Sequence, residues 1–374
     1  MASSLDRLLQ DSSIVICAGS GGVGKTTTAA AIAAGLAASG KRVAVVTIDP
    51  ARRLADALGL EQLTNQPELV DADRFAAAGL NIKGELWAMT LDSQRTFDEL
   101  IDTLSPDTET RDQILGNRIY EQLSGAVAGS QEFTAIAKLY ELDRSGRFDT
   151  IVLDTPPSRN ALDFLDAPDR LTGFFDGRAL KLLLAPTGFA ARALGAGTGA
   201  ILGVLKRITG AELLEDLSVF FQALGGLIDG FRERAEAVRT LLADPATTFV
   251  VITSPQRDSA EEAIFFAEKL RGAQMNFGAL IINRVHSVGS ADEAAPTLAA
   301  ATKQLGGEFD QALATKLLSS YSDALALAER DAATIVRLKQ ETGEIDPVIV
   351  PELAGDVHDV EGLLAIERQL FATA

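Results

Sequence analysis

The sequence predicts an α/β fold, a doubly wound and mostly parallel sheet of about seven or eight strands with a helical insertion subdomain. Two observations predict it. Short apolar runs rich in β-branched residues alternate along the chain with longer segments of helical periodicity. Most of these runs are continuously apolar rather than alternating with polar residues, which is typical of strands that helices cover on both faces.

Seven strands are expected, with helices between them. The expected strands are Ile14–Ala18, Arg42–Ile48, Glu85–Leu91, Phe148–Asp154, Thr247–Thr253, Gly278–Asn283 and Pro347–Val350. Helical periodicity is clearest at Thr26–Ser39, Asp258–Gly272 and Phe309–Thr342. No internal repeat or low-complexity linker divides the sequence, so we expect residues 1–374 to form a single domain.

Two stretches interrupt this alternation. Residues 92–147 are predicted to be helical and mixed in charge, and residues 170–244 to form a helical, weakly charged insertion subdomain. Between Leu182 and Ile228 only six residues carry a charge. Such a surface suits a groove for an apolar client, a membrane-protein helix or a lipid. Apolar packing against the sheet or a partner subunit also explains the composition, and both interpretations stay open.

Charge and composition exclude several classes of protein. With 34 Lys and Arg against 52 Asp and Glu, the formal net charge is −18, which disfavours nucleic-acid binding. A single cysteine rules out an internal disulfide or a cysteine zinc site, and two histidines form no metal cluster. The N-terminus lacks a signal-peptide pattern, and the longest uncharged run, Thr26–Gly40, is too short to span a membrane. We therefore expect a cytoplasmic protein that is not an integral membrane protein.

A glycine-rich segment follows the first expected strand and opens a helix. Gly19–Thr26 fits the pattern GxxxxGK[ST], which wraps backbone N–H groups around phosphate oxygens at a helix N-terminus. Lys25 adds a full charge at the phosphates, and the Thr26 hydroxyl is a ligand for Mg²⁺. The sequence therefore predicts a P-loop NTPase that binds ATP or ADP with Mg²⁺. The residues expected to hold the nucleotide are Gly21, Gly22, Val23, Gly24, Lys25, Thr26 and Thr27.

Two carboxylates end strands that neighbour this loop. Asp49 follows the strand Arg42–Ile48, and Asp154 closes Phe148–Asp154. Ligands of open α/β sheets bind at the carboxyl ends of the strands, so both side chains are expected at the site. Asp154 is predicted to hold Mg²⁺ through water. Asp49, which stands before Pro50, also fits the N-cap of a helix, and the two interpretations of Asp49 are compatible.

Together these motifs resemble the arsenite-pump ATPases, a family of deviant Walker A ATPases that includes the cytosolic ATPase guiding tail-anchored membrane proteins. The phosphate loop is similar to the family's GKGGVGKT[ST], and further matches are DPARRLADA (Asp49–Ala57), DTPPSRNALDFLDAP (Asp154–Pro168), IINR (Ile281–Arg284) and VPEL (Val350–Leu353). The resemblance implies a dimeric ATPase in which Asp49 activates water, assists Mg²⁺ through water and acts with Lys25 in catalysis. It implies that Asn283 hydrogen-bonds adenine, and that Pro351 and Leu353 close over the base.

Departures from the family pattern carry their own predictions. The family's extra lysine, which crosses the dimer interface, is replaced by Ser20. A heterodimer with a paralogue that retains the lysine is the favoured explanation. A homodimer with Arg52 or Arg159 supplying charge in cis, or a nearly non-catalytic nucleotide-binding subunit, are the alternatives. The scarcity of cysteines argues against arsenite chemistry and a zinc-stapled dimer, and Cys17 is expected to be a core residue.

Overall fold

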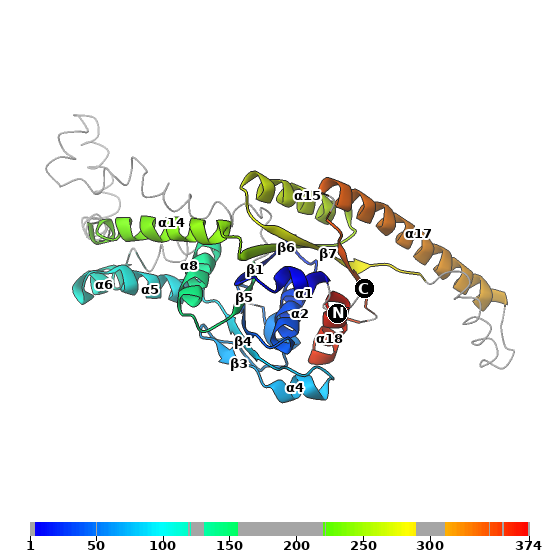
Figure 1. Cartoon of the computed structure of the whole chain (residues 1–374), viewed down its shortest axis with the longest axis horizontal. Coiled ribbons are helices and arrows are strands. Elements are labelled where there is room, and N and C mark those ends of the chain that lie inside the picture. The colour runs from blue at the N-terminus through cyan, green and yellow to red at the C-terminus, as the bar shows by residue number, and fades with distance from the viewer. Residues whose placement is uncertain are drawn as a thin grey trace.

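Eight strands form one sheet at the centre of the molecule (Figure 1). The computed structural model describes residues 4–49, 51–118, 120, 131–155, 220, 222–288, 311–343, 345–353 and 355–372. The strand order is β3-β4-β2-β5-β1-β6-β7-β8, and every pair is parallel except β3 with β4. The predicted fold class is confirmed. The bounds are β1 Ile14–Ala18, β2 Arg42–Thr47, β3 Glu68–Leu69, β4 Glu85–Thr90, β5 Thr150–Asp154, β6 Thr247–Thr253, β7 Phe277–Val285 and β8 Val348–Pro351.

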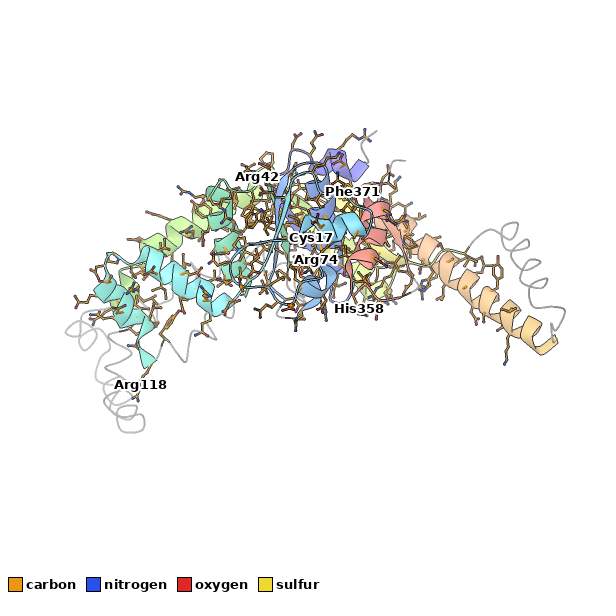
Figure 2. The ribbon with its side chains drawn as sticks, turned by 90° about the horizontal axis from the view of Figure 1, so that it is seen from below. Cys17, Arg42, Arg74, Arg118, His358 and Phe371 are labelled. Carbon is orange, nitrogen blue, oxygen red and sulfur yellow. The ribbon has the colours of Figure 1, made fainter. Side chains whose placement is uncertain are left out.

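The first strand lies in the middle of this sheet. β1 pairs with β5 on one side and with β6 on the other, and all its residues are buried. Cys17 belongs to β1 and lies near the centre of the molecule (Figure 2). Because the strands are parallel, the carboxyl ends of β1, β2 and β5 share one edge, where Thr47 and Cys17 both pair with Asp154. The register therefore brings the glycine-rich loop and the two expected carboxylates together.

Helices cover both faces of the sheet, each over its own apolar core. One face carries α1 Ser4–Leu9, α2 Lys25–Ala38, α3 Arg53–Ala57, α4 Ala72–Ala77 and α18 Val360–Leu370. The other carries α5 Ser93–Leu104, α6 Thr108–Leu115, α8 Gln131–Arg144, α14 Ile228–Ala243, α15 Arg257–Gly272 and α17 Gln311–Glu341. In Figure 1, α5, α6 and α14 extend beyond the sheet at one side, and α17 extends beyond it at the opposite side.

The helix that follows the glycine-rich loop is enclosed almost completely. Every residue of α2 from Thr28 to Ala37 is buried, which a helix made mostly of alanine permits because it is apolar on all sides. α18 packs along it, and a β carbon at Gly35 would lie 2.2 Å from the Phe371 ring. Figure 2 labels Phe371 at the end of this C-terminal helix. The packing fixes the position of α2, and with it the loop from which α2 starts.

Several elements differ from expectation at their ends. β3 is an antiparallel strand of two exposed residues that no apolar pattern predicts. β7 continues past Asn283 to Val285 through an irregularity in register, where Arg284 has a φ of 60°. Of the predicted insertion at 170–244, α14 is described, whereas residues 156–219 and 221 lie outside the described residues. Arg159, most of the second motif of the resemblance and most of the proposed apolar groove therefore lie there as well, whereas Phe220, Leu224 and Leu227 at the end of that stretch are buried in the core. No helix in the described ranges has the length and apolarity needed to cross a bilayer.

Candidate active site

The glycine-rich loop joins β1 to α2 in a conformation that two of its glycines make possible. Gly24 caps α2 with a φ of 90° and a ψ of 26°, in the left-handed region that side chains rarely adopt. At Gly19, a β carbon would stand 1.9 Å from the carbonyl oxygen of Ile252 in β6. The loop is therefore pressed against the end of β6, and its last residue turns the chain directly into the first residue of α2.

Lys25 lies inside the loop. Its side chain is buried, and Nζ donates a hydrogen bond of 2.9 Å to the carbonyl oxygen of Ser20. Burial lowers the pKa of Lys25, while the nearby carboxylates of Asp154 and Asp49 oppose that shift. No carboxylate in the described part of the chain lies within ion-pair distance of this ammonium group. A buried cation held by backbone alone is well suited to phosphate oxygens.

Asp154 is enclosed at the end of β5, next to the start of α2. Its Oδ2 accepts hydrogen bonds from Thr26 Oγ1 at 2.7 Å and from Thr47 Oγ1 at 2.8 Å. Burial raises the pKa of this carboxyl group to about 6, although the two hydroxyl hydrogen bonds counteract the rise. Among the described residues, its Oδ1 is buried without a hydrogen-bond partner. A free carboxylate oxygen beside a threonine hydroxyl fits a hydrated Mg²⁺ ion, because Mg²⁺ keeps several of its waters.

Asp49 lies just beyond the end of β2 and is connected to Asp154 through Thr47. Its backbone N–H donates to Thr47 Oγ1 at 3.2 Å, and Thr47 Oγ1 donates in turn to Asp154. The Asp49 side chain is 16% exposed, and Ala51 N donates to its Oδ1 at 2.9 Å. Its Oδ2 lies 3.3 Å from Nη1 of Arg53. The interpretation of Asp49 as a helix N-cap is wrong, since the N-cap of α3 is Arg52 and Asp49 instead makes a local turn to Ala51.

Asn283 reaches the glycine-rich loop from β7. Its Nδ2 donates to the carbonyl oxygen of Val23 at 2.8 Å, and its Oδ1 accepts from the backbone N–H of Arg284 at 2.9 Å. Pro351 pairs with Val285 at the end of β8, and Leu353 packs against the core that contains α2. These three residues therefore lie on the β7–β8 side of the loop. Contacts of Asn283, Pro351 and Leu353 with adenine stay predictions.

The chain matches the family model described as anion-transporting ATPase over residues 12–305, which is most of its length. The chain belongs to this family. A protein of Chlamydomonas reinhardtii named ATPase ARSA2 is 28% identical over 276 residues, covering 72% of this chain and 67% of the relative. The Aspergillus terreus ATPase get3 is 26% identical over 291 residues, covering 76% and 77%. The Arabidopsis thaliana ATPase GET3A is 28% identical over 274 residues, covering 72% and 66%.

Two residues at this site were not predicted from the sequence. Thr47 links the Asp154 carboxylate to the backbone N–H of Asp49, and only its position at the end of a strand indicates a place at the site. Arg53 contacts Asp49, and the only indication of this contact in the sequence is the spacing of four residues, at which oppositely charged side chains often pair. Arg52 lines a cavity of about 210 Å³ with Thr47, Thr90 and six other residues, and its role as a cation in cis stays a prediction.

Substitution of Gly24 by alanine should weaken nucleotide binding by this chain more than the same change at Gly22. Both glycines have positive φ, 90° and 78°, so each alanine costs about 1–2 kcal/mol in backbone strain. Only at Gly24 does the new β carbon meet a neighbour, since it would stand 2.4 Å from Nδ2 of Asn283, whereas nothing lies within 4 Å at Gly22. Calorimetric titration with Mg·ADP measures the affinity of each variant. Equal losses of affinity in the two variants would contradict the expected clash between the new β carbon and Asn283.

Proposed function

We propose that this chain hydrolyses ATP to ADP and phosphate with Mg²⁺, at the site formed by the glycine-rich loop, Asp49 and Asp154. The observation that carries the proposal is the arrangement around Asp154. Asp154 Oδ1 has no hydrogen-bond partner in the described residues, and Oδ2 of the same carboxylate accepts from the Thr26 hydroxyl. The neighbouring Lys25 is buried and has no carboxylate within ion-pair distance in the described ranges. Leaving such groups buried costs stability unless a ligand completes them.

In the proposed reaction each residue acts mainly by position and charge, which is what phosphoryl transfer requires. Lys25 and the N–H groups at the start of α2 bind the phosphates. Thr26 directly, and Asp154 through water, hold Mg²⁺, which when bound neutralises charge on the phosphate oxygens. Asp49 orients the attacking water and accepts its proton. Asn283, Pro351 and Leu353 are proposed to contact the adenine base.

We further propose that the chain works as a dimer with a homologous subunit, favouring a paralogue that supplies a lysine at the position of Ser20. Ser20 is 8% exposed, and its carbonyl oxygen is used by Lys25. Its hydroxyl is buried and has no hydrogen-bond partner among the described residues. A short, buried and uncharged side chain offers nothing to a neighbouring subunit. That supports a partner that provides the cation, or a subunit that binds nucleotide with little turnover of its own.

Coupling of hydrolysis to a switch of the helical subdomain belongs to the same proposal, and nucleotide-gated carriage of an apolar client or lipid is an alternative to it. Their support is the sequence between Leu182 and Ile228, where six residues are charged. Native mass spectrometry of the purified chain tests the carriage of a client. A bound peptide or lipid that is released when Mg·ADP is exchanged for an ATP analogue supports it, and protein without any bound molecule contradicts it.

Steady-state hydrolysis by the purified chain, alone and with its paralogue, tests the ATPase proposal. If the missing lysine limits turnover, Ser20→Lys should raise kcat of the chain alone by about 10³-fold or more, the smallest effect of a cation supplied in trans. Ser20→Gln, which adds length without charge, is the matched control and should not raise it. Full turnover of the unmodified chain with no gain from Ser20→Lys would remove the basis for the heterodimer.

A further inference from the structure

The carboxylate proposed to activate water is held on both of its oxygens. Ala51 N–H donates to Asp49 Oδ1, and the Arg53 guanidinium lies 3.3 Å from Oδ2. The first contact fixes the turn, because it is a local bond to the backbone two residues along. The second comes from a side chain and brings a full positive charge to the carboxylate. Arg53 therefore places a positive charge beside Oδ2.

Charge at the site gives this contact a further consequence. The groups whose charges act on Lys25 include the carboxylates of Asp154, Asp49 and Glu262. A nucleoside triphosphate would bring more negative charge to the surroundings of Lys25, in a chain whose net charge is −18. Asp49 is 16% exposed, so water screens its charge only partly. The Arg53 guanidinium beside Asp49 offsets the negative charge of one of these carboxylates.

The contact contributes little to the stability of the fold itself. The Arg53 side chain is 68% exposed, and ion pairs at such positions add little to stability. Arg53 is also the first residue of α3, where the positive end of the helix dipole disfavours a cation. The ion pair with Asp49 is a polar contact that the Arg53 side chain makes within the described residues.

We propose that Arg53 is a positioning residue of the nucleotide site, which orients the Asp49 carboxylate and offsets its charge so that a triphosphate is accepted beside it. The proposal rests on the proposed function. It assigns to Arg53, rather than to its neighbour Arg52, the cationic role in this segment. The described residues place no carboxylate within ion-pair distance of Arg52, whose side chain lines the cavity beside Thr47 and Thr90.

The test compares affinities for Mg·ADP and Mg·ATPγS by calorimetric titration in Arg53→Gln, Arg53→Lys and Arg52→Gln. Arg53→Gln should weaken Mg·ATPγS about threefold to fivefold more than Mg·ADP, as expected for loss of a partly exposed ion pair. Arg53→Lys, which keeps the positive charge, should retain most of the affinity for Mg·ATPγS. Arg52→Gln should leave the ratio of the two affinities unchanged. An equal loss in Arg52→Gln would show a general effect of charge and overturn the proposal.

A double-mutant cycle separates action through Asp49 from a structural role of Arg53. The Asp49→Asn background has no carboxylate charge to offset. In it, Arg53→Gln should change the ratio of the Mg·ATPγS and Mg·ADP affinities by less than half of the change that it causes in the unmodified chain. The same loss in both backgrounds would overturn the proposal.

A readout without nucleotide keeps this inference distinct from the proposed function. Amide hydrogen exchange at Ala51 should be faster in Arg53→Gln than in Arg52→Gln, because the freed carboxylate no longer holds the turn. Faster exchange in a chain that fails to bind nucleotide would refute the proposed function while retaining the contact. Unchanged exchange would refute the positioning role of Arg53.

Discussion

Replacement of Asp49 by asparagine is expected to lower the kcat for ATP hydrolysis by about 10²–10⁴-fold, the usual contribution of a positioned general base. Nucleotide binding should survive, because asparagine keeps the oxygen that accepts from Ala51 N–H and removes a negative charge near the phosphates. Single-turnover hydrolysis and titration with Mg·ATPγS measure the two effects separately. The expected pattern is a lost rate with an equal or improved affinity.

Asp56→Asn is the matched control for that experiment. Asp56 lies in α3, is exposed, and carries the same charge seven positions further along the segment. Its substitution removes one carboxylate from the same segment of the chain without touching the site, so the rate should stay within about twofold of the unmodified chain, as for most surface substitutions. Turnover retained in Asp49→Asn, or lost equally in Asp56→Asn, would remove the role assigned to Asp49.

Asp154→Asn is expected to stabilise the protein without nucleotide while impairing its use of Mg²⁺. Burial raises the pKa of Asp154 to about 6 from its ordinary value of 3.8. The folded state therefore binds this proton more tightly than the unfolded state. The resulting stability is fully present below about pH 4 and is lost as the pH rises through about 6. A neutral asparagine avoids that loss, so at pH 7.5 the free energy of unfolding should rise by about 1–3 kcal/mol.

The loss of function in the same variant should be large. Without the carboxylate, the affinity for Mg²⁺ in the presence of ADP should fall about 10–100-fold, which is the usual effect of removing a group that orients metal ligands. Thermal unfolding from pH 4.5 to 7.5, with and without Mg·ADP, measures both effects. A lower melting temperature for Asp154→Asn without nucleotide would contradict the view that burial of the charged carboxylate destabilises the folded protein.

Asp149→Asn supplies a control of opposite sign. Hydrogen bonds from Arg42 hold the pKa of Asp149 below its ordinary value, on the surface just before β5. Its contribution to stability is therefore present above the ordinary pKa of an aspartate and is lost as the pH falls through the lowered value. Asp149→Asn should be slightly destabilising at pH 7.5, whereas Asp154→Asn should be stabilising at the same pH.

Much of the sheet could be predicted because its strands are buried and continuous. The bounds of β1 and β6 agree with the expected strands, since every position of both is buried and polar or turn residues flank each run. The meeting of the glycine-rich loop with Asp154 also followed from sequence, because parallel strands align their carboxyl ends at one edge. β3 had no such pattern. Its two residues are exposed and pair with β4 only at the margin of the sheet.

The side-chain contacts of the site were the part that sequence could not supply. The hydrogen bond from Asn283 to Val23 joins residues 260 positions apart, so no local pattern specifies it. Thr47 reads as an ordinary strand residue until the register places it beside Asp154. The contact between Arg53 and Asp49 depends on how the chain turns after Asp49, where a helix N-cap was an equally good local solution.

The central place of β1 has a consequence for the order in which the protein acquires its site during synthesis. β1 lies between β5 and β6, whose paired residues begin at Ile151 and Thr247, long after β1 has left the ribosome. Gly19 packs against the backbone of Ile252, and Asn283 donates a hydrogen bond to the loop at Val23. A nascent chain lacking these segments has the complete phosphate-binding sequence but nothing to shape it. Nucleotide affinity should thus arise late in translation, so that a growing chain does not take up ATP before its sheet is assembled.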